Sequence, residues 1–389
     1  MSKRRHKSFK SSIHPANNVI LQTRSNRLYP FCVSGLLLTI VACIYFWAFK
    51  PDPESRLREQ IETYAKTSQF AKAEASWQKM SEIIPDCIRA QDQIDWATSA
   101  LRADHPGAAL SVLQDWKRDN PDKPDGWLLI LDLTRILGNS DLMMADVSSL
   151  LKIESVNRNT AVLVGATLGL LTDLDQQDVR SRLKRWTEKE PNSPLALSSL
   201  LLRYAENPLP EDPSRDVRIN LARSVATQHP KSIPAMTSLI ETLFNGGFYE
   251  EAIQVLESWP VEMRAESAWH RLQGRRLQDA DGKHTEAVLE FQAALKFNPH
   301  DWKTRYRLAR ALAAAGRIEE SRNEARSMSL IRESLEPNRL AEILKSAIPK
   351  GRSPEPERLI SLLQSIELTT LANAWRNWQA DQKLLKFQK

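Results

Sequence analysis

The side chains that most often carry out catalysis or bind metals are scattered along this chain. Its seven histidines include no His-Glu-x-x-His sequence and no pair four residues apart. There is also no glycine-rich loop of the kind that binds phosphate through backbone N–H groups, and no Gly-x-Ser-x-Gly turn for a nucleophilic serine. We therefore expect no enzymatic activity, no metal site and no bound cofactor.

One residue type could carry a covalent modification. Cys43 ends the sequence Ile40-Val41-Ala42-Cys43, which is similar to a bacterial lipobox, where the cysteine is lipidated and the preceding residues are removed. The apolar run nevertheless continues to Phe49, whereas a lipoprotein signal usually becomes polar after its cysteine. We interpret Cys43 as an apolar residue inside an uncleaved anchor, with a lipidated cysteine and an organellar presequence as the alternatives.

The apolar run that contains Cys43 is long enough to cross a membrane. Residues 29–49 carry no charged side chain and are bounded by Arg27 and Lys50. At 1.5 Å per residue, a helix of this length spans a hydrocarbon core of about 30 Å. Aromatic residues near both ends favour the membrane interface. The sequence therefore predicts one transmembrane helix, a signal-anchor.

Charge sets the expected orientation of that anchor. Residues 1–50 contain eight Lys or Arg and no acidic residue, whereas the rest of the chain contains 46 basic and 48 acidic residues. Basic flanks tend to stay in the cytoplasm, so residues 1–28 are predicted to be a cytoplasmic tail and the C-terminal domain extracytoplasmic, in the periplasm. The high pI belongs to this tail, and no nucleic-acid partner is expected. Cys87 is alone beyond the anchor, so no disulfide is predicted there.

Beyond residue 50 the chain repeats a pattern of residue sizes. An alanine is followed four and seven positions later by further apolar residues, and prolines recur at intervals of one or two units of 34 to 39 residues. Such spacing places three apolar residues on one face of a helix, and a proline ends that helix. The pattern predicts an all-α array of helical hairpins. It begins at Ala73, Ala109, Ala252 and Ala287, and the prolines are Pro85, Pro121, Pro191, Pro230 and Pro299.

This pattern resembles the tetratricopeptide repeat (TPR), a helix–turn–helix unit of 34 residues. The clearest units are 233–264, 266–299 and 302–333, and the second keeps Trp269, Leu272 and Phe291 at the family's spacing. The resemblance implies a right-handed α-solenoid over residues 54–333. One hairpin cannot bury its apolar face alone, but a stack of hairpins does so. Residues 334–389 are predicted to form C-terminal helices that act as a cap or as a docking segment.

The resemblance also implies a peptide-binding groove, because the first helix of each unit lines the concave face in this family. The positions that point into the groove carry many basic side chains. Residues 264–352 contain 18 basic and 12 acidic residues, whereas residues 51–263 contain 23 and 32. Arginines beside a tyrosine suit carboxylates, so an acidic peptide segment is the expected ligand. The alternative is that these charges solvate a helix face or pair with the acidic half of another copy of this chain. The predicted groove residues are His270, Arg271, Lys303, Tyr306, Arg307 and Arg310.

The last helix offers a second candidate surface. Leu371, Trp375 and Trp378 lie on one face of the segment "LTTLANAWRNWQADQKLLKF". These side chains either cap the solenoid or fill a groove on a partner protein.

Together these features predict a membrane-anchored scaffold for protein–protein interaction that assembles an envelope or secretion complex. The alternatives are a regulatory subunit of a membrane enzyme or transporter, and a lipoprotein lipidated at Cys43. The sequence does not select the partner, the pathway or the oligomeric state.

Overall fold

The structure is a computed structural model that describes residues 52–67, 69–85, 88–172, 174–334, 336–348 and 356–387. Contacts divide the chain into Met1–Arg56 and Leu57–Lys389, and the account below concerns the second unit. The predicted tail (1–28), the predicted anchor (29–49) and Cys43 lie outside the described residues. Within the described ranges, none of the helices combines the length and the apolar character needed to span a bilayer.

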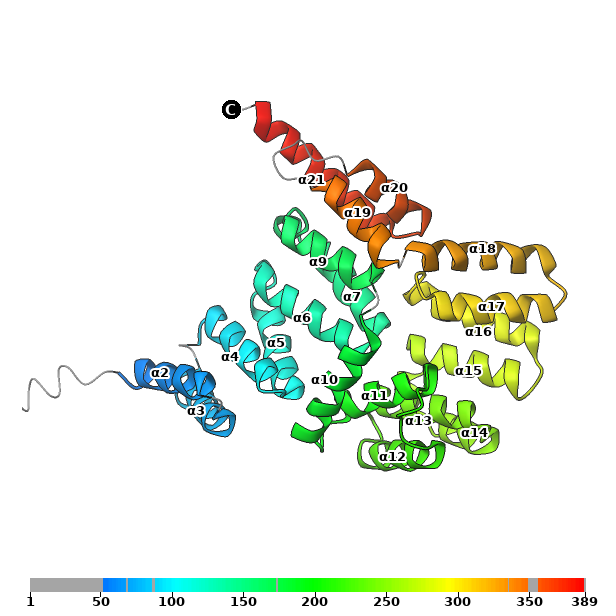
Figure 1. Ribbon diagram of the computed structural model, residues 1–389, viewed down its shortest axis with the longest axis horizontal. Coiled ribbons are helices and arrows are strands. Elements are labelled where there is room, and N and C mark those ends of the chain that lie inside the picture. Colours follow the sequence, from blue (N-terminus) through cyan, green and yellow to red (C-terminus); the bar gives the residue numbers. More distant parts are fainter. Residues whose placement is uncertain are drawn as a thin grey trace, which may run out of the picture. The chain divides into compact units, whose positions relative to one another are not determined.

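The part of the chain that the structure describes is helical and contains no strand, which confirms the predicted all-α solenoid of hairpins (Figure 1). The elements are α2 (Pro53–Lys66), α3 (Phe70–Ile83), α4 (Ala90–Arg102), α5 (Pro106–Asp119), α6 (Pro124–Leu137), α7 (Ser140–Leu150), α8 (Glu154–Asn157), α9 (Thr160–Leu171), α10 (Gln176–Lys189), α11 (Pro194–Glu206), α12 (Arg215–Gln228), α13 (Ile233–Gly246), α14 (Tyr249–Glu257), η2 (Val261–Met263), α15 (Ser267–Asp279), α16 (His284–Phe297), α17 (Trp302–Ala314), α18 (Ile318–Ser334), α19 (Pro337–Ala347), α20 (Glu357–Ser365) and α21 (Thr369–Phe387).

The five spaced prolines end helices as expected, and each helix stops two residues before its proline. The residue between helix end and proline leaves the helical region in every case, as in Asn120 (φ −137°, ψ 56°) and Asn298 (φ −140°, ψ 84°). Steric contact with the proline ring disfavours helical geometry at the preceding residue, which explains this common ending. The helices concerned are α3, α5, α10, α12 and α16.

The repeated apolar face is buried wherever the sequence predicted it. Ala73, Ala109, Ala252 and Ala287 are all fully buried, and the large residues that follow them line the core. Trp259 is buried although it lies beyond the end of α14, where its indole N–H donates to the Met263 carbonyl at 3.3 Å. The small alanine therefore brings two helices close, and the larger residues fill the space around it.

The hairpins do not form one continuous stack. Helices α4 to α9 make a first array, in which α9 packs against α6, α7 and α8. The second array starts with α10, which packs against α11 and α6, and α11 packs against α5 and α6. The backbone N–H of Gly107, at the start of α5, donates to Glu190 after α10 at 2.8 Å. The second array therefore begins beside the first, and its later helix α16 also packs on α7.

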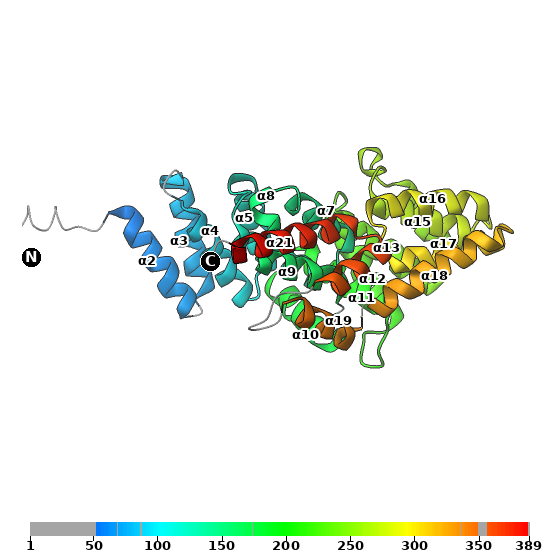
Figure 2. The same cartoon turned by 90° about the horizontal axis from the view of Figure 1, so that it is seen from above.

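The C-terminal helices lie across the first array. Helix α21 packs along α9 in both views, while α20 packs on α21 and on α19 (Figures 1 and 2). Helix α20 begins at Glu357, and Pro356 stands at its N-cap. Helix α21 therefore covers an apolar face of α9 in the first array.

Candidate functional site

The predicted groove residues belong to two adjacent first helices, α15 and α17. Asp301 positions the start of α17, because its carboxylate accepts the backbone N–H groups of Lys303 at 3.0 Å and Thr304 at 3.2 Å. This is a normal N-cap, in which an acidic side chain satisfies the free donors of the first turn. Trp302 and Lys303 are thereby held at the end of α17 that faces α11 and α15.

Arg271 is engaged within the protein. Its guanidinium donates to Asp141 of α7 at 2.6 Å and lies 3.8 Å from Asp301. Burial alone would lower the pKa of Arg271, but the neighbouring carboxylates Asp141, Asp301 and Glu241 raise it instead. Arg271 therefore serves as a permanent cation that joins α15 to α7, rather than an open position for a ligand.

Three more of the predicted residues also have acidic neighbours in the chain. Lys303 Nζ lies 2.6 Å from Glu206 of α11, and Arg307 lies 3.1 Å from Asp279 of α15. The Nδ1 atom of His270 lies 2.8 Å from Glu290 of α16. These contacts pair basic residues of this region with acidic residues of the same chain, which neither the groove hypothesis nor its alternatives had predicted.

Sequence reasoning missed Arg275, which is the most connected residue of this face. Its side chain is 6% exposed, pairs with Glu241 of α13 and with Asp279 at 3.3 Å, and donates to Asn245 at 2.6 Å. Arg275 lies four residues after Arg271 and so falls on the same side of α15. That spacing was a usable signal for Arg275, but no sequence pattern points to its acidic partners on other helices.

Tyr306 and Arg310 remain accessible on α17. Tyr306 is 48% exposed, and the guanidinium of Arg310 lies 5.9 Å from the centre of its ring. Within the described ranges Arg310 forms no ion pair. The two side chains are one turn apart on the outer face of α17, so they present a cation and an aromatic ring together to solvent.

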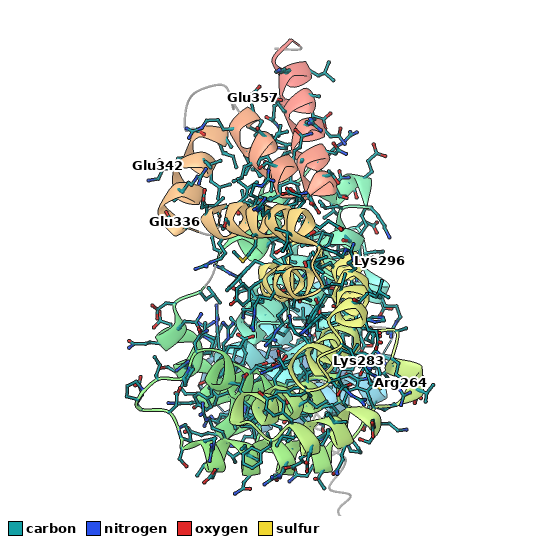
Figure 3. The ribbon with its side chains drawn as sticks, turned by 90° about the vertical axis from the view of Figure 1, so that its right-hand side faces the viewer. Arg264, Lys283, Lys296, Glu336, Glu342 and Glu357 are labelled. Atoms are coloured by element: carbon teal, nitrogen blue, oxygen red, sulfur yellow. The ribbon has the colours of Figure 1, made fainter. Side chains whose placement is uncertain are left out.

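The charged surface beyond this pair is divided between elements. Figure 3 shows Lys283 and Lys296 on the α15–α16 hairpin, and Glu336, Glu342 and Glu357 on the C-terminal helices. Glu336 and Glu357 stand at the starts of α19 and α20, where a negative charge is stabilised by the helix dipole. Of the 18 basic and 12 acidic residues in 264–352, 14 and 10 lie in 264–333, so charges of both signs are spread over the repeat helices.

The predicted docking residues are in the core. Leu371, Trp375 and Trp378 are each less than 5% exposed. The indole N–H of Trp375 donates to the hydroxyl of Thr167 at 3.0 Å, and that of Trp378 to Thr160 at 2.8 Å. Both threonines belong to α9, so this face of α21 is already occupied within the protein, and the placement favours a cap.

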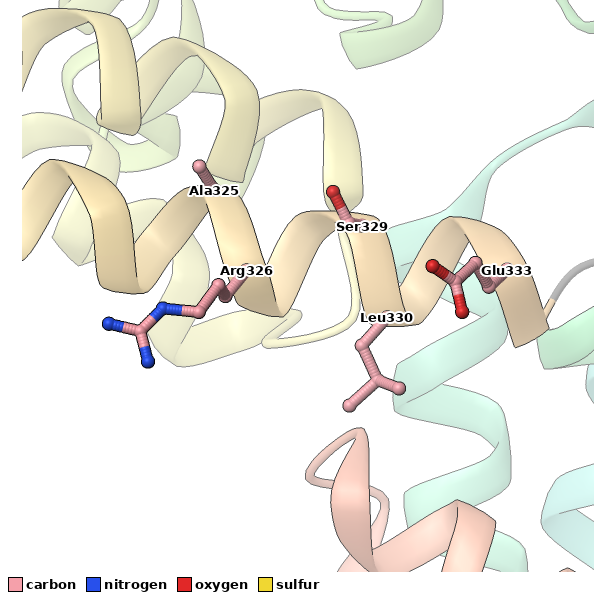
Figure 4. Close-up of a pocket in the computed structure, with 5 residues that line it drawn as sticks. All are labelled: Ala325, Arg326, Ser329, Leu330 and Glu333. Atoms are coloured by element: carbon pink, nitrogen blue, oxygen red, sulfur yellow. The ribbon is translucent and has the colours of Figure 1, made fainter.

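An open groove runs along α18. It has a volume of about 440 Å³ and is lined by Ala325, Arg326, Ser329, Leu330 and Glu333 (Figure 4). All five residues come from one face of one helix. The groove offers no convergent set of polar groups from different elements, which small-molecule sites usually have.

The repeat helices match a known family. Residues 280–332, which contain α16 and α17 and nearly all of α18, match the model of the tetratricopeptide repeat. This part of the chain is similar to a TPR. Tyr306, Arg307 and Arg310 fall within the matched TPR segment, whereas His270 and Arg271 precede it.

Solved structures give a looser comparison. A tetratricopeptide repeat protein from Parabacteroides merdae is 14% identical over 67% of this chain and 99% of its own, with a TM-score of 0.32. Cut9 with Hcn1, described as an APC/C hetero-tetramer, matches at 12% identity over 91% of this chain and 73% of its own, with a TM-score of 0.38. MamA from Desulfovibrio magneticus RS-1 matches at 17% over 41% and 88%, with a TM-score of 0.30. At these scores none of them supports a functional argument. No curated protein matches the chain by sequence.

Proposed function

We propose that this protein is a membrane-anchored scaffold that binds other proteins through its TPR-like solenoid on the extracytoplasmic side. The observation that carries the binding role is the accessible pair Tyr306 and Arg310 on α17, inside the segment that matches the TPR model. An exposed arginine over an aromatic ring suits an acidic peptide segment, because guanidinium groups bind carboxylates in a fixed geometry.

We place the proposed contact surface on α17. Arg271 and Arg275 are held by acidic residues of α7, α13 and α15, so a ligand would have to replace those contacts. Lys303 and Arg307 are more accessible, with side chains 48% and 27% exposed. We therefore propose that Tyr306 and Arg310 form the centre of the contact surface and that Lys303 and Arg307 lie at the edge of this surface.

Crosslinking in intact membranes followed by affinity capture tests the binding role. We expect Tyr306→Ala combined with Arg310→Glu to remove most captured protein while leaving thermal stability unchanged, because neither side chain is buried. Arg326→Glu on α18 is the matched control, since it makes the same charge change on a neighbouring exposed helix. Equal capture by the double variant and by wild type would contradict the proposed surface.

A separate measurement tests the anchor. The intact mass of the membrane-extracted protein, together with protease accessibility in sealed cells and in spheroplasts, distinguishes the three arrangements. A full-length mass with digestion only in spheroplasts would support the extracytoplasmic solenoid. A mass that begins at Cys43 with acyl chains would replace the anchor by a lipid. Protection in spheroplasts would place the solenoid in the cytosol and contradict the proposal.

A further inference from the structure

The C-terminal hairpin meets the second array at the turn between α16 and α17. His300 lies in this turn and is 7% exposed. Its backbone N–H donates to the side chain of Asn298 at 3.1 Å, which fixes the turn, but neither ring nitrogen makes a hydrogen bond of ordinary geometry. A buried polar group without a partner is uncommon and costs free energy, so this imidazole calls for an explanation.

The turn between α20 and α21 packs on this histidine. The carbonyl of Ile366, the residue that ends α20, faces the ring of His300. The next residue, Glu367, has a φ of 66°, a left-handed conformation that is unfavourable for a residue with a side chain. Its carboxylate lies 2.7 Å from Arg305 of α17. At this turn the hairpin contacts the second array through an ion pair that lies beside the imidazole.

The charges around His300 come from every element at this junction. Arg305, 7% exposed, also lies 2.8 Å from Glu324 of α18. Asp301 follows His300 in the chain and lies near Arg271, which in turn binds Asp141 of α7. The carboxylates are thus already paired with the two arginines. A proton on His300 would add a second buried cation next to Arg305, with no carboxylate left unpaired to balance it.

These surroundings keep the imidazole neutral. Burial, reinforced by the charge of Arg305, lowers the pKa of His300 to about 4, although the Ile366 carbonyl and Asp301 act in the opposite direction. In a released state the imidazole would be hydrated and would regain its ordinary pKa of 6.5. Because the closed state binds the proton less tightly, closure is stable above pH 6.5 and weakens as the pH falls toward 4.

We propose that His300 is the sensor of an acid-triggered latch, which holds the α20–α21 hairpin on the array at neutral pH and releases it on acidification. Release would uncover the face of α9 that carries Thr160 and Thr167, where Trp375 and Trp378 now pack. The junction is the natural point of opening because Glu367 already occupies an unfavourable conformation there. This inference does not depend on the proposed peptide contact of α17.

Hydrogen exchange of the full-length protein, measured by mass spectrometry between pH 7 and pH 4.5 and corrected for intrinsic rates, tests the latch. The two pKa values predict that the opening equilibrium of α20–α21 rises roughly 60-fold over this range. Peptides from α13 and α14 serve as the internal reference and should keep their protection. Equal loss of protection in both regions would overturn the proposal, because it would indicate global unfolding.

Two variants isolate the contribution of the histidine to the pH dependence. His300→Gln and His300→Phe should each remove most of the pH-dependent opening, whatever their effect on protection at pH 7. His229→Gln is the matched control, because His229 also lies beside a proline in the turn between two helices but is partly exposed. An unchanged pH-dependent opening in both His300 variants would overturn the proposal.

Discussion

Arg180 binds the connection between α11 and α12 through several hydrogen bonds and an ion pair. Its side chain is 4% exposed and lies 2.9 Å from Asp212, whose side chain is 2% exposed. The same guanidinium donates to the carbonyls of Arg203 and Asn207 at the end of α11. Asp212 also accepts the backbone N–H of Leu209 at 2.7 Å. One cation thus joins α10 to both ends of the connection between α11 and α12.

Arg180→Leu should therefore be strongly destabilising. The substitution leaves the carboxylate of Asp212 buried without its partner, which typically costs about 3–5 kcal/mol. Thermal or urea unfolding of the purified protein measures the change. Arg223→Leu is the control, since the Arg223–Glu251 pair is 42% and 33% exposed and should contribute less than about 1 kcal/mol. Similar losses in the two variants would show that burial is not the cause.

Asp92 gives a residue-scale prediction that depends on pH. Burial acts to raise its pKa, but hydrogen bonds from Arg58 and Arg89 outweigh this and lower the pKa to about 2. The ionised form is thus favoured in the folded state, so its stabilisation is present above pH 4 and is lost as the pH falls toward 2. Because the site is only partly shielded from solvent, Asp92→Asn should cost about 1 kcal/mol at pH 7. Unfolding measured at both pH values should show no difference between variant and wild type near pH 2.

At the scale of helices, glycine decides how closely two elements approach. A Cβ atom on Gly126 of α6 would lie 2.3 Å from the ring of Trp116, which is fully buried on α5. A Cβ on Gly169 of α9 would lie 3.1 Å from the flexible end of Met143 on α7. A Cβ on Gly165, also in α9, would lie 2.9 Å from Leu128 of α6, so both glycines lie close to side chains of neighbouring helices.

Gly126→Ala should therefore be costly and Gly169→Ala should not. A rigid buried indole must move in the first variant, and overpacking of this kind typically costs about 1–3 kcal/mol. In the second variant a methionine adapts easily, and alanine also favours the helix by about 1 kcal/mol over glycine. The free energies of unfolding of the two variants test this difference. Equal values would mean that α5 and α6 can move apart at Gly126 without a cost in stability.

The helices and their ends were predictable because their causes are local. Proline spacing, the small alanine and the apolar residues around it act within one hairpin, so residues 233–257 could be divided into α13 and α14 from sequence. The sequence did not predict that the second array, which starts with α10, begins beside the first array. This placement depends on contacts between distant residues, such as Gly107 with Glu190. One signal was present: α9 is apolar on nearly all sides, which is typical of a helix buried from several directions.

The candidate site was predictable only in part, for the same reason. The basic positions on α15 and α17 follow from the repeat, but the carboxylates that engage them come from distant segments. Asp141 lies 130 residues before Arg271, and Glu206 lies 97 residues before Lys303. The charge counts showed that residues 51–263 carry a net negative charge. They did not indicate which acidic residue pairs with which basic residue. Only the three-dimensional arrangement separates the engaged Arg271 from the accessible Arg310.

At the scale of the whole second unit, the C-terminal helices connect the end of the second array to the first array. Helix α21 contributes Trp375 and Trp378 to the same core as α9, and Asp381 lies 3.2 Å from Arg158 beside α8. At its other end, Glu367 pairs with Arg305. A cap of this kind removes apolar surface from solvent, whereas a docking helix would keep its aromatic face for a partner.

Trp375→Ala should distinguish the two roles. Truncating a fully buried tryptophan typically costs about 3–5 kcal/mol, which corresponds to a fall in Tm of about 4–7 °C in a unit of this size. Leu384→Ala on the same helix is the control, because Leu384 is 62% exposed and its loss should leave the Tm unchanged. A docking role predicts the opposite result for Trp375→Ala, with an unchanged Tm and a lost partner in affinity capture. The hydrogen bond from Trp375 to Thr167 makes the stability loss the expected outcome, and Thr167→Val should reproduce a smaller part of it because it removes only the acceptor.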